Sequence, residues 1–411
     1  MEGGPRLEHG KRDALTYAEA LGRILAATRA LPTELIPLDS ALGRSAGADV
    51  LSAVDMPGFD NAAVDGYALR FCSGERVFRL AGRVEAGQEA KGIDMNSGDA
   101  VRVFTGAPVP PAAETVVMQE LCEESQGYVT VSELPPVGAN IRRRGEEIQA
   151  GDRLVRVGDT LTPPRLALLA SGGVREVPVH RTPRVGILST GNELVAPGHA
   201  LQPGQIYLSN PTGLSAALRG LGITDVTCLH TADDPESTLA AVKNLLETCD
   251  VVLVSGGVSV GERDYVKSAL EAAGVKREFW GIAVRPGQPF YFGTYGEKLI
   301  FGLPGNPVSA LVTFWMLVRP SLLRSQGRDV PGPAEARLTD DLSKHAGRME
   351  FVRGIMMTHG VEQVVGSISA RGSHMMGGFA AANCLIHAPL ETDCLLAGSI
   401  VKVTPLNWTS L

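Results

Sequence analysis

With 411 residues, the chain exceeds what one hydrophobic core supports, so we expect two to four domains. Its composition, 44% hydrophobic and 20% charged, is typical of a soluble globular protein, and no window offers the roughly 18 uninterrupted apolar residues of a membrane helix. The net charge of −7 argues against a general nucleic-acid binder, because neutralising many phosphates requires a basic surface.

The chain begins with a polar, charged stretch, residues 1–13, which lacks the apolar core of a signal peptide. The cysteines are scattered, without a Cys-x-x-Cys pair or a histidine at ligand spacing. We therefore interpret them as reduced thiols and not as a zinc site or a disulfide frame: Cys72, Cys122, Cys228, Cys249, Cys384 and Cys394. Both features favour a cytoplasmic protein.

The first predicted element is a helix of about 13 residues that follows a capping box at residues 16–19. Its apolar residues recur at helical spacing: Ala18, Leu21, Leu25 and Ala26. A short extended piece and a helical turn follow within residues 34–44. We expect residues 14–50 to form one discontinuous domain with residues 148–183, where a further helix starts at Pro163.

Residues 51–147 are predicted to form a small β domain, because short alternating runs are separated by turn formers. A loop near its start carries Asp60 and Asp65, and loops of this kind often hold functional sites. The run Arg142–Arg144 next to two glutamates has two interpretations: a solvated turn of mixed charge, or a loop that faces an anion.

Residues 184–330 alternate strand, turn and helix, which predicts an α/β/α domain with a mostly parallel sheet. Ligands collect beyond the carboxyl ends of such strands. The strand ends carry four acids that we expect to converge in space, although paired acids there can be helix caps only: Glu193, Asp233, Asp234 and Asp264.

Residues 251–264 read as a buried strand, a glycine-rich turn and the start of a helix. Gly256 and Gly257 allow several backbone N–H groups to converge on an oxyanion. Asp264 would repel a phosphate unless a divalent cation lay between them, so the stretch predicts a nucleotide-type substrate with a metal. The alternative is a plain turn with a capping aspartate.

The segments 282–289 and 301–309 bracket a predicted hairpin, and a helix follows from about Pro307 to Leu323. The free N–H groups at the start of that helix offer a second anion site, to which Arg285 could add a cation. Residues 331–411 are predicted to form a C-terminal β domain resembling a barrel. The expected fold class is therefore a multidomain α/β and β protein with the α/β/α domain at its centre.

Six motifs, taken in order, resemble the molybdopterin molybdenumtransferase (MoeA) family, which is akin to the C-terminal region of gephyrin. They are residues 57–68 (PGFDNAAVDGYA), 105–110 (TGAPVP), 143–147 (RRGEE), 189–194 (STGNEL), 255–264 (SGGVSVGERD) and 302–309 (GLPGNPVS). The resemblance covers nearly the whole chain. It implies insertion of molybdate into adenylylated molybdopterin with release of AMP, a divalent cation such as Mg²⁺, and a homodimer. It also implies transient contact with the molybdopterin adenylyltransferase and with molybdoenzyme acceptors, and gives no role to nucleic acid or a membrane.

By motif, the resemblance implies catalytic roles for Asp60, Thr105, Glu193 and Asp264, and metal binding by Glu193, Asp233 and Asp264. It implies substrate binding by Gly256, Gly257, Ser259, Arg285, Pro304, Gly305, Asn306, Pro307, Arg353 and Ser373. Relatives often carry lysine where this chain has Arg285 and Gln288. Arg285 carries the same positive charge on a planar guanidinium group, whereas Gln288 is neutral.

Two other functions stay open. Adenylyl transfer to molybdopterin is one, because adenylylating proteins resemble residues 184–330, although they lack flanking β domains. A non-catalytic scaffold of the gephyrin kind is the other, and the acids at the carried-over positions argue against it.

Overall fold

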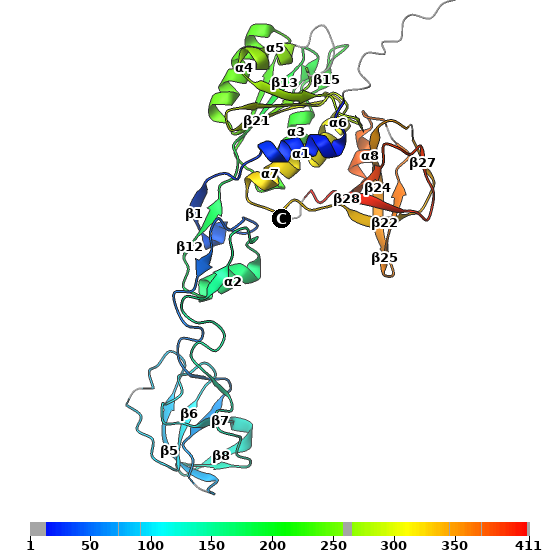
Figure 1. Ribbon diagram of the computed structural model, residues 1–411. Coiled ribbons are helices and arrows are strands. Elements are labelled where there is room, and N and C mark those ends of the chain that lie inside the picture. Colours follow the sequence, from blue (N-terminus) through cyan, green and yellow to red (C-terminus); the bar gives the residue numbers. More distant parts are fainter. Residues whose placement is uncertain are drawn as a thin grey trace, which may run out of the picture. The chain divides into compact units, whose positions relative to one another are not determined.

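The computed structural model describes residues 14–72, 74–90, 92–257, 265–344, 346–370 and 372–408. The chain divides into two compact units (Figure 1). Unit 1 comprises Met1–Glu34, Gly43–Gly47 and Val179–Leu411, and unit 2 comprises Leu35–Leu42 and Ala48–Pro178. The finer division into four domains stays a prediction.

The centre of unit 1 is a six-stranded sheet, and its mostly parallel character confirms the predicted fold class. The strand order is β16 (Val226–Thr231), β13 (Val185–Thr190), β17 (Val251–Ser255), β21 (Lys298–Leu303), β20 (Tyr291–Tyr295) and β18 (Lys276–Trp280). The first four strands run parallel, and β20 and β18 pair antiparallel beside them. The predicted hairpin is β20–β21.

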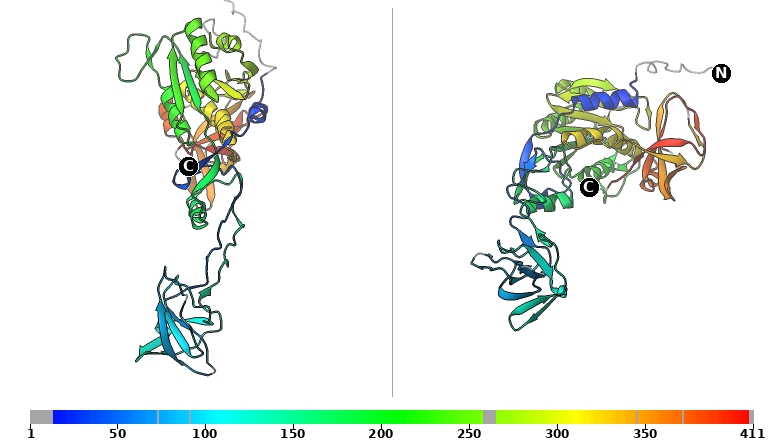
Figure 2. Two further views of the ribbon diagram at one scale, coloured as in Figure 1. Left: turned by 90° about the vertical axis from the view of Figure 1, so that its left-hand side faces the viewer. Right: turned by 60° about the horizontal axis from the view of Figure 1, so that its bottom comes forward.

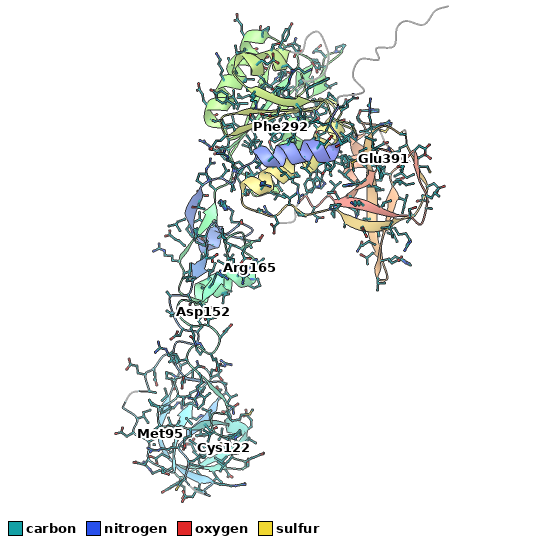
Figure 3. All side chains as sticks on the ribbon, in the orientation of Figure 1. Met95, Cys122, Asp152, Arg165, Phe292 and Glu391 are labelled. Atoms are coloured by element: carbon teal, nitrogen blue, oxygen red, sulfur yellow. The ribbon has the colours of Figure 1, made fainter. Side chains whose placement is uncertain are left out.

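Helices cover both faces of this sheet because side chains along β17 alternate between two apolar cores. Val252 and Val254 pack with α4 (Pro235–Thr248) and α5 (Tyr265–Ala272). Leu253 packs on the other face with α3 (Asn210–Arg219), α1 (Tyr17–Ala27) and the long helical segment described next (Figure 1). Phe292, labelled in Figure 3, is fully buried in this second core.

The long helix predicted from Pro307 is present in three consecutive stretches: α6 (Pro307–Thr313), a π-helical turn (Phe314–Val318) and α7 (Arg319–Ser325). The capping box of α1 is also present, because Thr16 and Glu19 exchange hydrogen bonds. The predicted apolar face of α1 is only partly right, because Leu21 packs against the core but two of the other residues do not. Ala20 and Ile24 are fully buried, whereas Ala18 and Ala26 are exposed, because tertiary packing selects the side that faces the core.

A closed five-stranded barrel forms the C-terminal part of unit 1, as predicted. Its strands pair in the order β24 (Met349–His359), β25 (Glu362–Ser367), β22 (Ala334–Leu338), β28 (Ile400–Pro405), β26 (Cys384–Ala388) and back to β24. Figure 2 shows these strands in orange and red from two further sides. Strand β19 (Val284–Arg285) adds to β24 in parallel and so links the barrel to the α/β part of unit 1.

Unit 2 contains a six-stranded sheet in the order β7 (Thr115–Met118), β4 (Gly66–Leu69), β6 (Asp99–Val103), β5 (Val77–Val84), β9 (Tyr128–Val131) and β8 (Cys122–Ser125). Met95, labelled in Figure 3, is buried in its core. The strand pairs β3 (Asn61–Ala62) with β10 (Ile141–Arg142) and β2 (Val50–Leu51) with β11 (Arg153–Val155) complete the unit, together with helix α2 (Pro163–Ser171) and the 3₁₀ turns Leu38–Ser40 and Gln119–Leu121.

The remaining short elements are the pairs β1 (Thr33–Pro37) with β12 (Glu176–His180), β14 (Leu194–Val195) with β15 (Ile206–Tyr207), and β23 (Leu342–Ser343) with β27 (Cys394–Leu395), and helix α8 (Met376–Ala380). Among the described helices, none is both long enough and apolar enough to cross a membrane.

Asp250 joins the start of β17 to the segment before β13. Its carboxylate accepts two hydrogen bonds from the Arg181 guanidinium, at 2.6 and 2.8 Å, and one from the Arg184 backbone N–H at 2.9 Å. Its side chain is 15% exposed. Burial by itself raises the pKa of Asp250, but the hydrogen bonds from Arg181 and Arg184 outweigh it and hold the pKa well below its usual range.

We therefore expect Asp250→Asn to destabilise unit 1 at neutral pH by about 1–3 kcal/mol, because charge-assisted hydrogen bonds are lost. The ionised carboxylate stabilises the fold above its unfolded pKa of about 4, and this contribution is lost as the pH falls through the lower, folded pKa. The difference between the wild type and the variant should thus shrink as the pH falls below about 4.

Fluorescence can follow unit 1 alone, because all three tryptophans, Trp280, Trp315 and Trp408, lie in it. Glu297→Gln is the control, since its ion pair with Arg29 is fully at the surface and contributes little. A constant difference between wild type and Asp250→Asn from pH 7 to pH 2 would contradict the assignment.

Candidate functional site

Two adjoining cavities in unit 1 collect most of the predicted site residues. The strand-end cavity, of about 600 Å³, lies at the carboxyl ends of β13, β17 and β21 and is lined by Glu193, Asp233, Gly256, Gly257, Pro304, Gly305, Asn306 and Pro307 among others. The arginine cavity, of about 440 Å³, is lined by Arg285, Arg353, Ser373, Pro304 and Asn306 among others. Both share Pro289, Pro304 and Asn306, so they form one continuous site.

The glycines that follow β17 are needed for backbone shape. Gly256 and Gly257 have φ angles of 93° and 64°, a region that side-chain-bearing residues rarely adopt. A Cβ atom on Gly257 would lie 2.4 Å from Cγ2 of the buried Val266. The backbone of this turn therefore comes close to the helix behind it and leaves the cavity side open. The predicted residues Ser259 and Asp264 lie outside the described residues.

Asn210, at the start of α3, ties the two turns of the strand-end cavity together. Its side-chain N–H groups donate to Ser255 Oγ at 2.7 Å and to the Gly305 carbonyl at 2.8 Å. Its side-chain oxygen and Ser189 Oγ on the neighbouring strand are buried, and neither has a hydrogen-bond partner among the residues that the structure describes. Asn210 therefore holds the end of β17 against the turn that precedes α6.

The neighbouring acids Asp233 and Asp234 have different roles. Asp234 caps α4 by accepting the Ser237 N–H at 2.8 Å, and this hydrogen bond lowers its pKa. Asp233 lines the strand-end cavity and exchanges hydrogen bonds of 3.2 and 3.3 Å with Asn192. The helix-cap interpretation thus holds for Asp234 and not for Asp233.

Glu193 and Asp233 are two oxygen donors of the kind that Mg²⁺ prefers, and both line one cavity. Within the described residues, no three His, Cys, Asp or Glu side chains form a group that could hold a metal ion. The pair alone fits Mg²⁺, which commonly binds through one or two carboxylates together with substrate phosphates.

The arginine cavity is positioned by the pairing of β19 with β24, which sets Arg285 opposite Glu350. Nε of Arg285 lies 3.9 Å from Oε1 of Glu350, whose side chain is only 11% exposed. Arg353 is 4% exposed and donates to the Met375 carbonyl at 3.0 Å. Ser373 Oγ accepts from the Asn306 side chain at 3.2 Å, which closes the rim between the two cavities.

Asp60 and Thr105 lie in unit 2, whereas the other predicted site residues belong to unit 1. Asp60 accepts the Arg144 N–H at 2.8 Å and the Arg143 guanidinium at 2.7 Å. The Arg144 N–H and then Arg143 outweigh partial burial and lower the pKa of Asp60. Thr105 donates its N–H and hydroxyl to one oxygen of Asp65, at 2.8 and 2.7 Å.

Arg144 also donates to Asp55 at 2.6 Å, so it and Arg143 are both paired with acids of their own unit. These pairs agree with the turn of mixed charge, and the anion-facing interpretation of residues 142–144 stays a prediction. Asp60 and Arg143 line a cavity of about 490 Å³ within unit 2, next to the Pro108–Pro111 segment.

Sequence reasoning missed several residues that line the two cavities. Asn210, Ser189 and Tyr207 line the strand-end cavity, and Arg348, Glu350 and His374 line the arginine cavity. A polar residue at the first turn of a helix that follows a strand is a weak signal for Asn210. No local signal marks Arg348 or Glu350, because their position depends on the pairing of two distant strands.

Comparison with known families matches three consecutive models to the chain. "MoeA N-terminal region (domain I and II)" matches residues 15–173, "Probable molybdopterin binding domain" matches residues 186–324, and "MoeA C-terminal region (domain IV)" matches residues 335–406. Together they span nearly the whole described chain in one order.

Individual proteins agree with these models. The chain is 40% identical to a molybdopterin molybdenumtransferase of Haemophilus influenzae, over 91% of this chain and 94% of that protein. It is 36% identical to molybdopterin molybdenumtransferase 2 of Mycobacterium tuberculosis, over 90% and 95% of the two chains. The crystal structure of a molybdopterin biosynthesis MoeA protein from Pyrococcus horikoshii superimposes with a TM-score of 0.82 at 32% identity, covering 96% of this chain and 99% of that chain.

Proposed function

The chain belongs to the MoeA family, and from this premise we propose that it is a molybdopterin molybdenumtransferase, which inserts molybdenum into adenylylated molybdopterin and releases AMP. The observation that carries the proposal is the shared rim of the two cavities. Pro304 and Asn306 border both, so two ligands bound in them would be neighbours. A reaction that joins an oxyanion to a phosphate-bearing molecule requires that arrangement.

The strand-end cavity binds the adenylylated molybdopterin in this proposal. The N–H of Gly257 and those of the first turn of α6 bind phosphate oxygens, whereas the Gly256 N–H is already donated to the Leu303 carbonyl at 3.2 Å. Asn210 keeps these two turns at a fixed spacing through its hydrogen bonds to Ser255 and Gly305.

Glu193 and Asp233 hold Mg²⁺ in the same proposal, as hard oxygen ligands beside the phosphate turn. When bound, Mg²⁺ neutralises phosphate charge and polarises the bond to AMP. Asn192 orients Asp233 through its two hydrogen bonds. The arginine cavity binds molybdate, since Arg285 and Arg353 supply charge and Ser373 supplies a hydroxyl.

The experiment that tests the function is incubation of the protein with adenylylated molybdopterin and Mg²⁺, with and without molybdate, while AMP is measured. We expect AMP release to depend on molybdate. ATP-dependent attachment of AMP to molybdopterin would identify an adenylyltransferase, and no turnover in either direction would identify a scaffold.

Separate replacement of Asp233 and of its neighbour Asp234 distinguishes metal binding from helix capping. Asp233→Asn should lower the rate of AMP release by about 100-fold or more, since loss of outer-shell partners alone costs about 10–100-fold. Asp234→Ala should lower the midpoint of thermal unfolding slightly and leave the rate unchanged, because Asp234 only caps α4. Equal rate losses in the two variants would rule out the proposed role of Asp233.

We further propose that the protein works as a homodimer in which Asp60 and Thr105 of one chain act on the substrate held by its partner. Asp60 and Thr105 belong to unit 2, and the residues that line the two cavities belong to unit 1. The proposed functional residues are therefore divided between two compact units. Its substrate comes from an adenylylating enzyme and its product goes to molybdoenzymes, so we also expect transient contact with both.

Mixing an Asp60→Ala chain with a Glu193→Ala chain tests the shared site. Each homodimer should be inactive, whereas a heterodimer contains one doubly damaged site and one intact site. Random exchange makes about half the dimers heterodimers, so about a quarter of wild-type activity should return. If the chains exchange, as shown by differently tagged copies, and no activity returns, each site is built from one chain.

A further inference from the structure

Arg348 lines the arginine cavity and has no role in the assignments above. It lies directly before β24, is exposed, and uses its backbone carbonyl to accept a hydrogen bond from Lys344 Nζ at 2.8 Å. Among the described residues, no hydrogen bond or ion pair holds its guanidinium group. As far as the described residues go, Arg348 therefore brings an unpaired positive charge to this cavity.

The other charges of this cavity are already engaged. Nε of the half-exposed Arg285 lies 3.9 Å from the Glu350 carboxylate, which is largely buried, so the negative charge of Glu350 offsets part of the charge of Arg285. Arg353 is 4% exposed and donates to a backbone carbonyl at 3.0 Å. Gln288, on the same wall, is neutral.

Three arginines and one glutamate line this cavity within the described part of the chain, which leaves two positive charges in excess. Glu350 offsets Arg285, and Arg348 is one of the two remaining cations in this formal count. A tetrahedral oxyanion with two negative charges matches this balance, whereas a singly charged anion leaves one cation uncompensated. Removal of Arg348 reduces the excess to one.

We propose that Arg348 is a specificity-determining residue of the arginine cavity: with Glu350 offsetting Arg285, Arg348 supplies the charge by which the cavity retains a doubly negative oxyanion. This proposal rests on the proposed function in one respect, because it takes molybdate to be that oxyanion. Arg348 acts by its charge at the cavity wall, and Glu350 sets how much of the charge of Arg285 an entering anion experiences.

Calorimetric titration of the full-length protein with sodium molybdate tests the proposal. Arg348→Gln should weaken molybdate binding by about tenfold or more, the loss expected for one charge-assisted contact. Arg348→Lys keeps the charge and should stay within about threefold of the wild type. Arg29→Gln is the matched control, because Arg29 is an exposed arginine paired with Glu297 and contacts neither cavity.

Glu350→Gln tests the offset directly. This variant should bind molybdate more tightly than the wild type, and the double variant Arg348→Gln/Glu350→Gln should return to within a few-fold of the wild type. Tryptophan fluorescence, which reports on unit 1, verifies that Glu350 variants fold. If they do not fold, the comparison of Arg348→Gln with Arg348→Lys decides.

Wild-type affinity in Arg348→Gln, an equal loss in Arg348→Lys, or no recovery in a folded double variant would each overturn the proposal. These titrations need no pterin, so they are independent of turnover. Absence of molybdate-dependent AMP release in the wild type, together with the expected binding pattern, would reject the proposed function and leave the role of Arg348 intact.

Discussion

The parallel register of β13, β17 and β21 is the constraint on which both cavities depend. It places Ser189 beside Ser255 and Ser255 beside Leu303, so three chain segments end at the same edge of the sheet. The turns that follow these strands have to share the space beyond that edge. The strands behind these turns are buried along almost their whole length, so the turns carry the polar groups at this edge.

Each turn has a local reason to be where it is. The turn after β17 depends on positive φ angles at Gly256 and Gly257, and the turn after β21 leads through Pro307 at the first position of α6. The Asn210 side chain joins both turns through Ser255 and Gly305. One amide group therefore couples the spacing of the two turns, which neither turn could set alone.

Charge divides the site into two parts. The strand-end cavity is lined by the acids Glu193 and Asp233, whereas the arginine cavity is lined by three arginines and one glutamate. The second cavity exists because β19 extends the barrel sheet and brings Arg285 next to Glu350. The barrel is thus a structural wall of the site, since it supplies the residues that face the α/β part of unit 1.

The sequence by itself determined the elements whose signals are local: the capping box of α1, the alternation of strand and helix around β17, the glycine turn and the Pro-Gly-Asn-Pro turn before α6. The sequence also indicated the family and eleven of the residues that line the two cavities. Only the tertiary structure decided which face of α1 is buried, that Arg143 and Arg144 pair with Asp60 and Asp55, and that Asp233 lines a cavity while Asp234 caps a helix. It alone brought Arg348 and Glu350 to the arginine cavity. The physical reason is that these outcomes depend on contacts between residues far apart in the chain, whereas a sequence pattern reports only the preferences of neighbours.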